Sequence, residues 1–275
     1  MNFRYRKPIL VQPAYIPHGG ALFGVPQSLI ADKDEIAFII QFIANRQLFG
    51  HAYRVLQADY FDEMLLDAGV FIAPLILTHK IFPGTHRPGD VDLLVIPYEG
   101  DHLVLERTLA IEFKVIRASF ARQGKSPNDF GYSQAAALLD LGIPYVAVGH
   151  FITSDSSPRE LWHQVMRGEI LDSSGRFGNT TMVDHDMLPS DLMIRALGRL
   201  KSNSPLPHIG LLASYMNLET EMGPRYRGGW IPEGQRASLN PRTRIKALDA
   251  VEAFFHRNAQ YFLRTPRYDP PNSKR

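Results

Sequence analysis

Two short apolar stretches with charged residues inside them constrain the fold of this chain more than any other feature. The first spans residues 89–96 and contains Asp92, and the second spans residues 109–116 and contains Glu112 and Lys114. Both have the length and composition of β-strands. Side chains alternate across a strand, so Glu112 and Lys114 share one face while the apolar residues beside them share the other. If the two strands are neighbours, two carboxylates and one ammonium group can meet at one place.

Such a meeting point has a chemical use as a metal site. Two carboxylates bind a hard cation such as Mg²⁺ through oxygen, with water and substrate phosphate as further ligands. The ion can activate a water molecule, and a lysine beside it can position the attacking hydroxide or shield developing negative charge. Alternatively, a Glu and a Lys two residues apart on a strand form a solvated face or an ion pair. The Asp on the earlier stretch and the helix expected after the second stretch favour the metal site.

The order of these residues resembles the PD-(D/E)XK nuclease superfamily, in which an Asp on the second core strand precedes Glu-x-Lys on the third. In this chain the pattern falls on Asp92, Glu112 and Lys114. The first motif departs from its usual Pro-Asp form, because residues 88–92 read Pro-Gly-Asp-Val-Asp. We assign the motif to Asp92 because an apolar Leu-Leu-Val follows it directly, as is typical of the family. Asp90 would face the same side and could assist.

The resemblance implies an α/β fold with a restriction-endonuclease-like core of helix, three strands, helix and strand (αβββαβ). Its central mixed sheet would be flanked by helices, with additional N- and C-terminal helices outside the core. Hydrophobic periodicity agrees with this order. It predicts a helix at 53–67, a strand at 70–77, the two motif strands, a helix at 129–141 and a strand at 144–151. The core would occupy residues 50–152.

The remaining regions are expected to surround this core. Residues 1–49 are predicted to form an N-terminal arm and a helix, and residues 267–275 a loose tail. Residues 153–266 are predicted to be a mostly helical extension, packed on the core or forming a small second domain. Ser157 and Glu160 resemble a capping box, which predicts a helix at 157–167. Further helices are predicted near 32–47, 190–200 and 240–263.

The resemblance also implies accessory residues around the three motif side chains. The backbone carbonyl of Phe113 would be a further metal ligand, and Gln134 in the helix at 129–141 would support substrate or water. Family members often place a Glu in the first core helix facing the site, and Glu63 is our first candidate for it, with Glu35 the second. Gln134 and both glutamates could equally be exposed surface residues.

Basic residues flank both motif stretches. Lys80 and Arg87 precede the Asp stretch, whereas Arg117, Arg122 and Lys125 follow the Lys stretch. Cations on loops can follow a phosphate backbone. An ordinary solvated loop would have a similar composition, but as a group these residues fit a nucleic-acid substrate better than a small metabolite.

Composition sets limits on the function. The 275-residue chain has a formal net charge of +2, too mild to identify a nucleic-acid binder without a local basic surface. The absence of cysteine excludes disulfides, thiolate zinc sites and cysteine nucleophiles. The N-terminus lacks the apolar core of a signal peptide, and no apolar stretch approaches the roughly 20 residues that span a bilayer. We therefore expect a cytoplasmic protein with no membrane partner.

Together these features predict a phosphodiesterase that uses Mg²⁺ or Mn²⁺ to cleave nucleic acid, most simply a DNA endonuclease. A homodimer would suit the cutting of both strands of a duplex, and partner proteins of a defence or repair system are compatible with this function. One alternative is a catalytically inactive nucleic-acid-binding or assembly module that retains the nuclease fold. Another is an α/β protein of chance resemblance that acts on a small phosphorylated compound.

Overall fold

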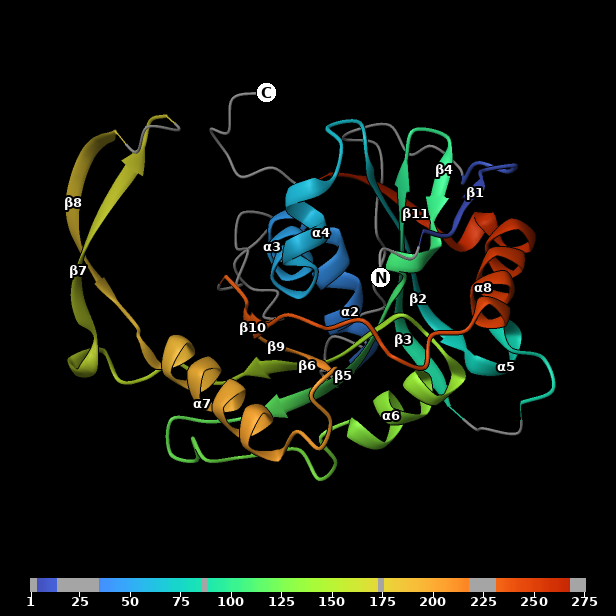
Figure 1. Ribbon diagram of the computed structural model, residues 1–275. Helices are drawn as coiled ribbons and strands as arrows, with labels where there is room; N and C mark the ends of the chain where they lie inside the picture. The colour runs from blue at the N-terminus through green and yellow to red at the C-terminus, as the bar shows by residue number, and fades with distance from the viewer. Residues whose placement is uncertain (1–3, 14–34, 86–88, 173–175, 218–230, 268–275) are drawn as a thin grey trace.

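A computed structural model describes residues 4–13, 35–85, 89–172, 176–217 and 231–267 of the chain. It is an α/β structure in which a large, curled mixed sheet is flanked by helices on both faces (Figure 1). The main sheet runs in the order β1-β4-β3-β5-β6-β9-β10, with β2 on β3 and β11 on β2. Its strands are β1 (Arg6–Pro8), β2 (Gly69–Leu77), β3 (Asp90–Glu99), β4 (His102–Val104), β5 (Leu109–Arg117), β6 (Tyr145–Thr153), β9 (Gly210–Tyr215), β10 (Glu233–Gln235) and β11 (Leu263–Pro266).

Strand directions divide the sheet into two parts. The pairs β2–β3 and β3–β5 are antiparallel, whereas β5–β6 and β6–β9 are parallel. The connection between the parallel strands β5 and β6 passes through helix α6 (Tyr132–Leu141). Helices α7 (Leu188–Asn203) and α8 (Ile245–Arg257) lie C-terminal to β6, and the short α5 (Thr78–Ile81) follows β2.

The two faces of β5 pack into different hydrophobic layers. Phe113 belongs to the layer covered by α2 (Glu35–Ala44), α3 (Arg46–Leu56) and α4 (Ala58–Glu63). Its ring centroid lies 4.3 Å from that of Phe151 and 5.5 Å from that of Phe42. Ala110 and Ile116 belong to the opposite layer, where α6, α7 and α8 pack. The alternation along β5 therefore places Glu112 and Lys114 on the α6 side of the sheet.

The ladder between β3 and β5 is short, and this opens the sheet at one end. It pairs only Leu93 to Val95 with Leu109 to Ile111, whereas β5 and β6 remain paired over nine positions. Beyond Leu93, Asp92 and Phe113 therefore lie on strands that no longer share a backbone ladder. This separation positions the candidate site.

Most of the predicted core elements are confirmed, and one is wrong. The four strands and the helix at 132–141 form within a few residues of the expected boundaries. The expected single helix at 53–67 is instead broken at Gln57, between α3 and α4. The carbonyl of Leu56 accepts a hydrogen bond from the backbone N–H of Ala237 across the fold. A tertiary contact thus takes the acceptor that a continuing helix would use.

The expectation of a mostly helical region at 153–266 is wrong. Its described residues contain five strands, and β9 and β11 extend the main sheet, so the region packs on the core. The predicted helix at 157–167 is also absent: a 3₁₀ turn at Arg159–Leu161 leads into β7 (His163–Ile170), which pairs with β8 (Phe177–His185). The Ser157 hydroxyl bonds the Asp186 carboxylate at 2.7 Å instead of capping a helix.

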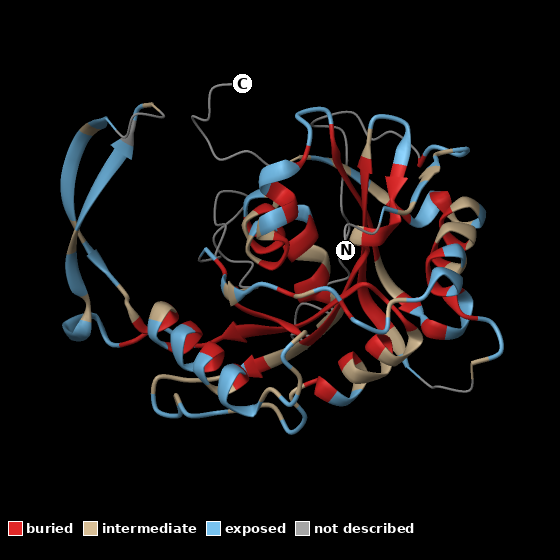
Figure 2. Cartoon of the chain, viewed as in Figure 1, coloured by how far each residue is buried: buried red, intermediate tan, exposed pale blue. Residues whose placement is uncertain are grey.

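The β7–β8 hairpin stands away from the body and is almost entirely exposed (Figures 1 and 2). Of the expected N-terminal arm, residues 4–13 are described and contribute β1, which pairs with β4. Residues 14–34 and most of the expected tail at 267–275 lie outside the described chain. Within the described residues, no helix combines the length and the apolar character that crossing a membrane requires.

Candidate active site

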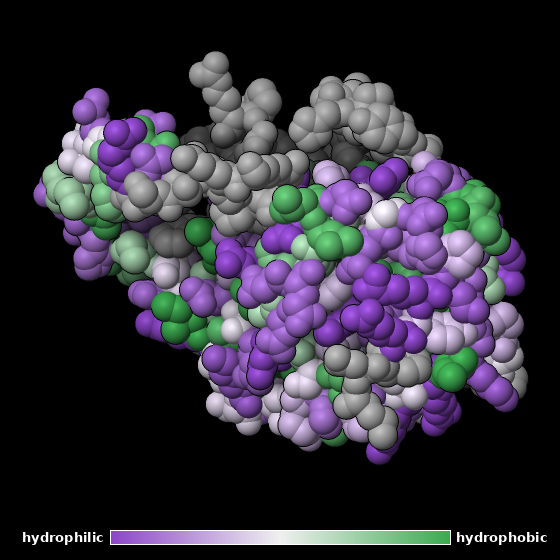
Figure 3. Space-filling model, turned by 45° about the horizontal axis from the view of Figure 1, so that its top comes forward, coloured by the Kyte–Doolittle hydropathy of each residue, from purple (hydrophilic) through white to green (hydrophobic). Residues whose placement is uncertain are grey.

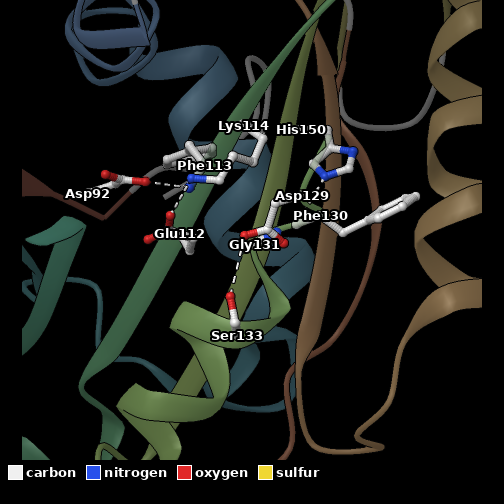
Figure 4. Close-up of polar contacts among 9 residues, drawn as sticks. All are labelled: Asp92, Glu112, Phe113, Lys114, Asp129, Phe130, Gly131, Ser133 and His150. Atoms are coloured by element: carbon white, nitrogen blue, oxygen red, sulfur yellow. Dashed lines mark hydrogen bonds and ion pairs between the residues drawn. The ribbon is translucent and has the colours of Figure 1, made fainter. Parts of the chain in front are cut away.

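Asp92 connects the two separating strands through its side chain. It is only 4% exposed, and its Oδ2 accepts a hydrogen bond of 2.6 Å from the backbone N–H of Phe113 (Figure 4). The carboxylate thus takes the donor that a continued β3–β5 ladder would have used. In a strand the N–H and C=O of one residue point to the same side, so the Phe113 carbonyl faces the same gap.

Glu112 and Lys114 complete the cluster from β5. Glu112 is fully buried, and its Oε1 accepts a hydrogen bond of 2.6 Å from Lys114 Nζ. Its Oε2 is buried without a hydrogen-bond partner among the described residues. An unpaired oxygen on a buried carboxylate is costly, and the cost is relieved when the group is protonated, shares a proton with the neighbouring Asp92, or meets a further ligand.

The electrostatics of the cluster make its two carboxyl groups hold protons more tightly than free carboxyl groups do. Burial raises the pKa of Glu112, and repulsion from Asp92 raises it further. Burial likewise raises the pKa of Asp92, where the Phe113 N–H acts in the opposite direction and Asp90 adds repulsion. The pKa of Lys114 is raised by Glu112 although burial opposes its charge. The cluster therefore favours any additional cation.

Helix α6 begins directly over Glu112. Gly131 precedes the helix with a φ of 89°, and a Cβ added there would lie 3.0 Å from Glu112 Cγ. Asp129 holds this turn, because its side chain accepts hydrogen bonds from Gly131 N at 3.1 Å and from Ser133 Oγ at 3.3 Å (Figure 4). Both the backbone conformation and the close approach require glycine at this position.

His150 is a neighbour that the sequence reasoning missed. It lies on β6 in register with Lys114, and its Nε2 is 3.2 Å from the Phe130 carbonyl in the turn before α6. Burial lowers the pKa of His150 to about 4, so the ring is neutral at pH 7. A histidine inside an otherwise apolar strand was the available signal. We interpret it as a positioning residue for the turn over Glu112.

The two candidate glutamates lie near opposite ends of β3. Glu35, the second choice, is the first residue of α2 and acts electrostatically on both Glu112 and Lys114. Glu63, the first choice, lines a pocket with Glu99, which is seven residues beyond Asp92 on β3 and hence roughly 23 Å away. The expectation for Glu63 is therefore wrong, because α2 rather than the helix after residue 53 packs on this end of β5.

Asp90 and Gln134 lie together beside the main cluster. Both line a pocket of about 260 Å³, with Thr78 and Gly89, between the start of β3 and α6. Asp90 repels the Asp92 carboxylate, which agrees with its expected position on the same side. Gln134 thus lies on the side of α6 that faces β3, next to Asp90.

Three of the five predicted nucleic-acid-binding residues gather on the loop after β5. Arg117, Arg122 and Lys125 line a pocket of about 560 Å³. Lys80 is exposed on α5 and is not part of that pocket, and Arg87 lies outside the described residues.

Two cations of α7, which the sequence reasoning missed, hold the same loop. Arg195 donates to Gln123 Oε1 at 2.6 Å, and Arg199 donates to the Lys125 carbonyl at 3.1 Å. The loop is therefore both basic and anchored to a long helix. The spacing of residues 123 and 195 in the sequence does not predict their contact, because folding alone brings the loop and α7 together.

The donor set fits a divalent metal ion. Among the described residues, no group of three or more His, Cys, Asp and Glu side chains is arranged to hold a metal. The two carboxylates of Asp92 and Glu112 together with the Phe113 carbonyl nevertheless supply oxygen donors at one point. Magnesium sites in phosphate chemistry commonly use one or two carboxylates, with water and substrate completing the shell.

No protein-family model, curated protein or solved structure matches this chain. The chemistry of the site and of its surroundings therefore has to carry any assignment of function.

Proposed function

We propose that this protein is a metal-dependent phosphodiesterase that cleaves nucleic acid, most simply a DNA endonuclease. The observation that carries the proposal is the convergence of Asp92, Glu112 and Lys114 at the point where β3 and β5 separate. The antiparallel order β2-β3-β5, the parallel β6 and the connecting α6 support a restriction-endonuclease-like core.

Each side chain has a distinct role in this proposal. Asp92, Glu112 and the Phe113 carbonyl would hold Mg²⁺ or Mn²⁺. When bound, the ion supplies an activated water molecule and stabilises negative charge on phosphate. Glu112 offers an oxygen that has no partner in the described chain, and Asp92 is oriented by the Phe113 N–H. Lys114 would contact the attacking water and the scissile phosphate.

The surroundings support nucleic acid as the substrate. The basic loop begins at Arg117, three residues beyond Lys114 on the same strand, and Arg122 and Lys125 lie on it. A phosphate backbone lying along this loop would bring a phosphodiester bond toward the metal site. Gln134 and Glu35 remain candidates for orienting water or substrate.

The principal alternative is a nucleic-acid-binding or assembly module without catalysis. Two observations favour it: no cluster of three metal-binding side chains is found in the described chain, and Lys114 is already paired with Glu112. Against it, a scaffold has no physical need for two buried carboxylates with raised pKa values.

The test is a cleavage assay with the full chain. Labelled linear, circular and single-stranded DNA, and RNA, are incubated with Mg²⁺, Mn²⁺ or chelator. We expect metal-dependent cleavage that Asp92→Asn, Glu112→Gln and Lys114→Ala each abolish while the circular dichroism spectrum is preserved. Glu63→Gln is the matched control, since this carboxylate lies at the other end of β3.

Cleavage by the Glu112→Gln variant at the wild-type rate would overturn the site assignment. Binding of DNA without turnover under every metal condition would favour the non-catalytic module instead. Calorimetry with Mg²⁺ alone separates these outcomes, because the proposed donors predict metal binding that Glu112→Gln weakens even before substrate is added.

A further inference from the structure

The β7–β8 hairpin exposes apolar side chains without any cover from the rest of the described chain. Met166 is 70% exposed, Phe177 66% and Met182 59%. Figure 3 shows green hydrophobic residues among purple ones on the hairpin at the left of that view. A two-stranded hairpin alone is at best marginally stable in water, and exposed apolar patches often mark interaction surfaces. The hairpin is therefore a candidate contact with another molecule.

The three most exposed apolar residues of the described hairpin, Met166, Phe177 and Met182, lie on one face of it. Met166 pairs directly with Met182, and Phe177 pairs with Ile170. Along β7, Ile170 lies two residues from Gly168 and four from Met166, so the three positions share one face. A Cβ built on Gly168 would lie 3.3 Å from Phe177 Cδ1, which places that ring over the same face. Arg167 and Glu169 flank Gly168 on the opposite face.

The two outer edges of the hairpin differ. Between the pairs Gly168–Thr180 and Ile170–Phe177, β7 advances two residues while β8 advances three. The extra residue lies on β8, and a bulge of this kind bends a strand and discourages further pairing. The outer edge of β7 is regular, and no strand of the described residues pairs with it. It is the edge that can accept another strand.

Charge disfavours nucleic acid as the partner of the hairpin. Residues 163–185 contain Arg167 and Arg176 against Glu169, Asp172 and Asp184, so 2 − 3 gives a net charge of −1 with neutral histidines. A polyanion gains nothing from such a surface. A strand from a protein partner is favoured instead.

We propose that β7 pairs antiparallel with β7 of a second copy of this chain, with Gly168 on the two-fold axis. In this register, a residue before Gly168 lies opposite the partner residue that is equally far after Gly168. Arg167 therefore faces the partner's Glu169, and Glu169 faces the partner's Arg167. Opposite charges at directly facing positions stabilise an antiparallel pair. The axis is perpendicular to the sheet, so the two methionine faces join on one side of a four-stranded sheet. The pairing does not depend on the proposed nuclease chemistry.

The test is the mass of the full chain in solution, measured by light scattering and sedimentation over a range of concentrations. Wild type should show a concentration-dependent species of twice the 31.0 kDa chain mass. Arg167→Glu or Glu169→Arg each puts like charges opposite one another twice per dimer. Each should raise the dimer dissociation constant about tenfold or more.

The double variant Arg167→Glu/Glu169→Arg should restore dimerisation, because it exchanges the charges in both contacts at once. Rescue of this kind is expected only for pairing with an identical strand. Lys246→Glu, an exposed charge reversal on α8, is the matched control and should dimerise as wild type.

A monomeric wild type at every concentration would overturn the proposal, as would single variants that dimerise like wild type or a double variant that stays monomeric. A dimer without nuclease activity would leave this inference intact and count against the proposed function alone.

Discussion

The two ends of β3 both carry clusters of acidic residues, yet their charge balance differs. At the far end a pocket of about 510 Å³ is lined by three arginines and three glutamates: Arg4, Arg6, Arg107, Glu63, Glu99 and Glu106. At the candidate site four carboxylates act on one another and on one ammonium group: Glu35, Asp90, Asp92, Glu112 and Lys114.

Most partners at the far end are supplied by the chain itself, although Glu106 Oε2, like Glu112 Oε2, is buried without a hydrogen-bond partner among the described residues. Arg6 pairs with Glu99 at 2.6 Å, and Tyr60 donates to the same carboxylate at 3.0 Å. Arg107 stacks over Tyr60 and bonds the Tyr145 hydroxyl at 2.8 Å. The larger pocket is therefore an internally balanced ion-pair network, whereas the smaller cluster has an excess of negative charge. The comparison teaches that charge imbalance distinguishes the candidate site from the far pocket better than cavity size does.

Replacing one carboxylate at each end of β3 should give the largest difference in cleavage rate and in stability between two variants. Glu112→Gln should lower metal-dependent cleavage about 10³-fold, because a donor at the reacting centre is lost. Its thermal stability should be unchanged or higher, since a buried charge is removed. Cleavage rates and melting curves measure both effects.

Glu99→Gln is the counterpart at the far end. It should keep full cleavage activity but lose about 1–2 kcal/mol of unfolding free energy, since Arg6 loses the nearer of its two carboxylate partners and Tyr60 loses a charged acceptor. If Glu99→Gln also abolished cleavage, the two ends would not be separable in function.

Two glycines with positive φ test the geometry of the same two ends. Gly131→Ala should lose about 1–2 kcal/mol of stability from left-handed strain. It should also lower cleavage roughly tenfold to a hundredfold, because the added methyl group would lie 3.0 Å from Glu112 Cγ. Gly100→Ala, in the β3–β4 turn, has φ 56° and open space around it, so it should lose stability without losing activity. Equal activity of the two variants would argue against close packing of α6 on Glu112.

A cation removed at each end tests where nucleic acid binds. Arg122→Gln should weaken DNA binding several-fold to about tenfold and reduce the slope of log affinity against log salt by about 1. Arg4→Gln, at the far pocket, should change neither quantity. Fluorescence anisotropy at several salt concentrations gives both values. A reduced slope for Arg4→Gln alone would move the binding surface to the other end of the sheet.

The smallest expected effect is a pH dependence of stability that comes from the acidic pair. The folded-state pKa values of Asp92 and Glu112 are raised, so the folded state holds more protons than the unfolded state above about pH 4. Their contribution to the free energy of unfolding therefore falls as pH rises through the folded pKa values. Glu112→Gln should flatten this decline in metal-free protein, and Mg²⁺ should oppose it in wild type.

His150 contributes a pH dependence of stability with the opposite sign, and it does so at lower pH. The comparison of variants must separate this contribution from that of the acidic pair. The folded pKa of His150 is lowered to about 4, so the unfolded state takes up a proton near pH 6.5 and the folded state does not. Its contribution is lost as pH falls through that window. Melting temperatures of wild type and Glu112→Gln, subtracted at each pH, cancel this shared term. A flat difference would contradict the raised pKa values.

The sequence predicted the core strands because their signals are local. Apolar residues on both sides of Asp92 and Glu112 mark buried strands regardless of what packs on them. The signal for the accessory glutamate is not local, because its identity depends on whether α2 or α4 covers the end of β5 in the folded protein. The hairpin was missed for a similar reason: Ser157 has the spacing of a helix cap, but Asp186, 29 residues away, binds its hydroxyl.

The closure of β2 by β11 has a consequence for how a newly made chain folds. β11 pairs with Gly69 to Ile72, so this part of the outer edge of β2 is open until a segment about 190 residues later has left the ribosome. At 5–20 residues per second this interval is about 10 to 40 s. During that time an apolar strand edge beside the motif strand is available to other chains, and chaperone protection would matter most then. The protein should accordingly be more prone to aggregate during translation than after its release.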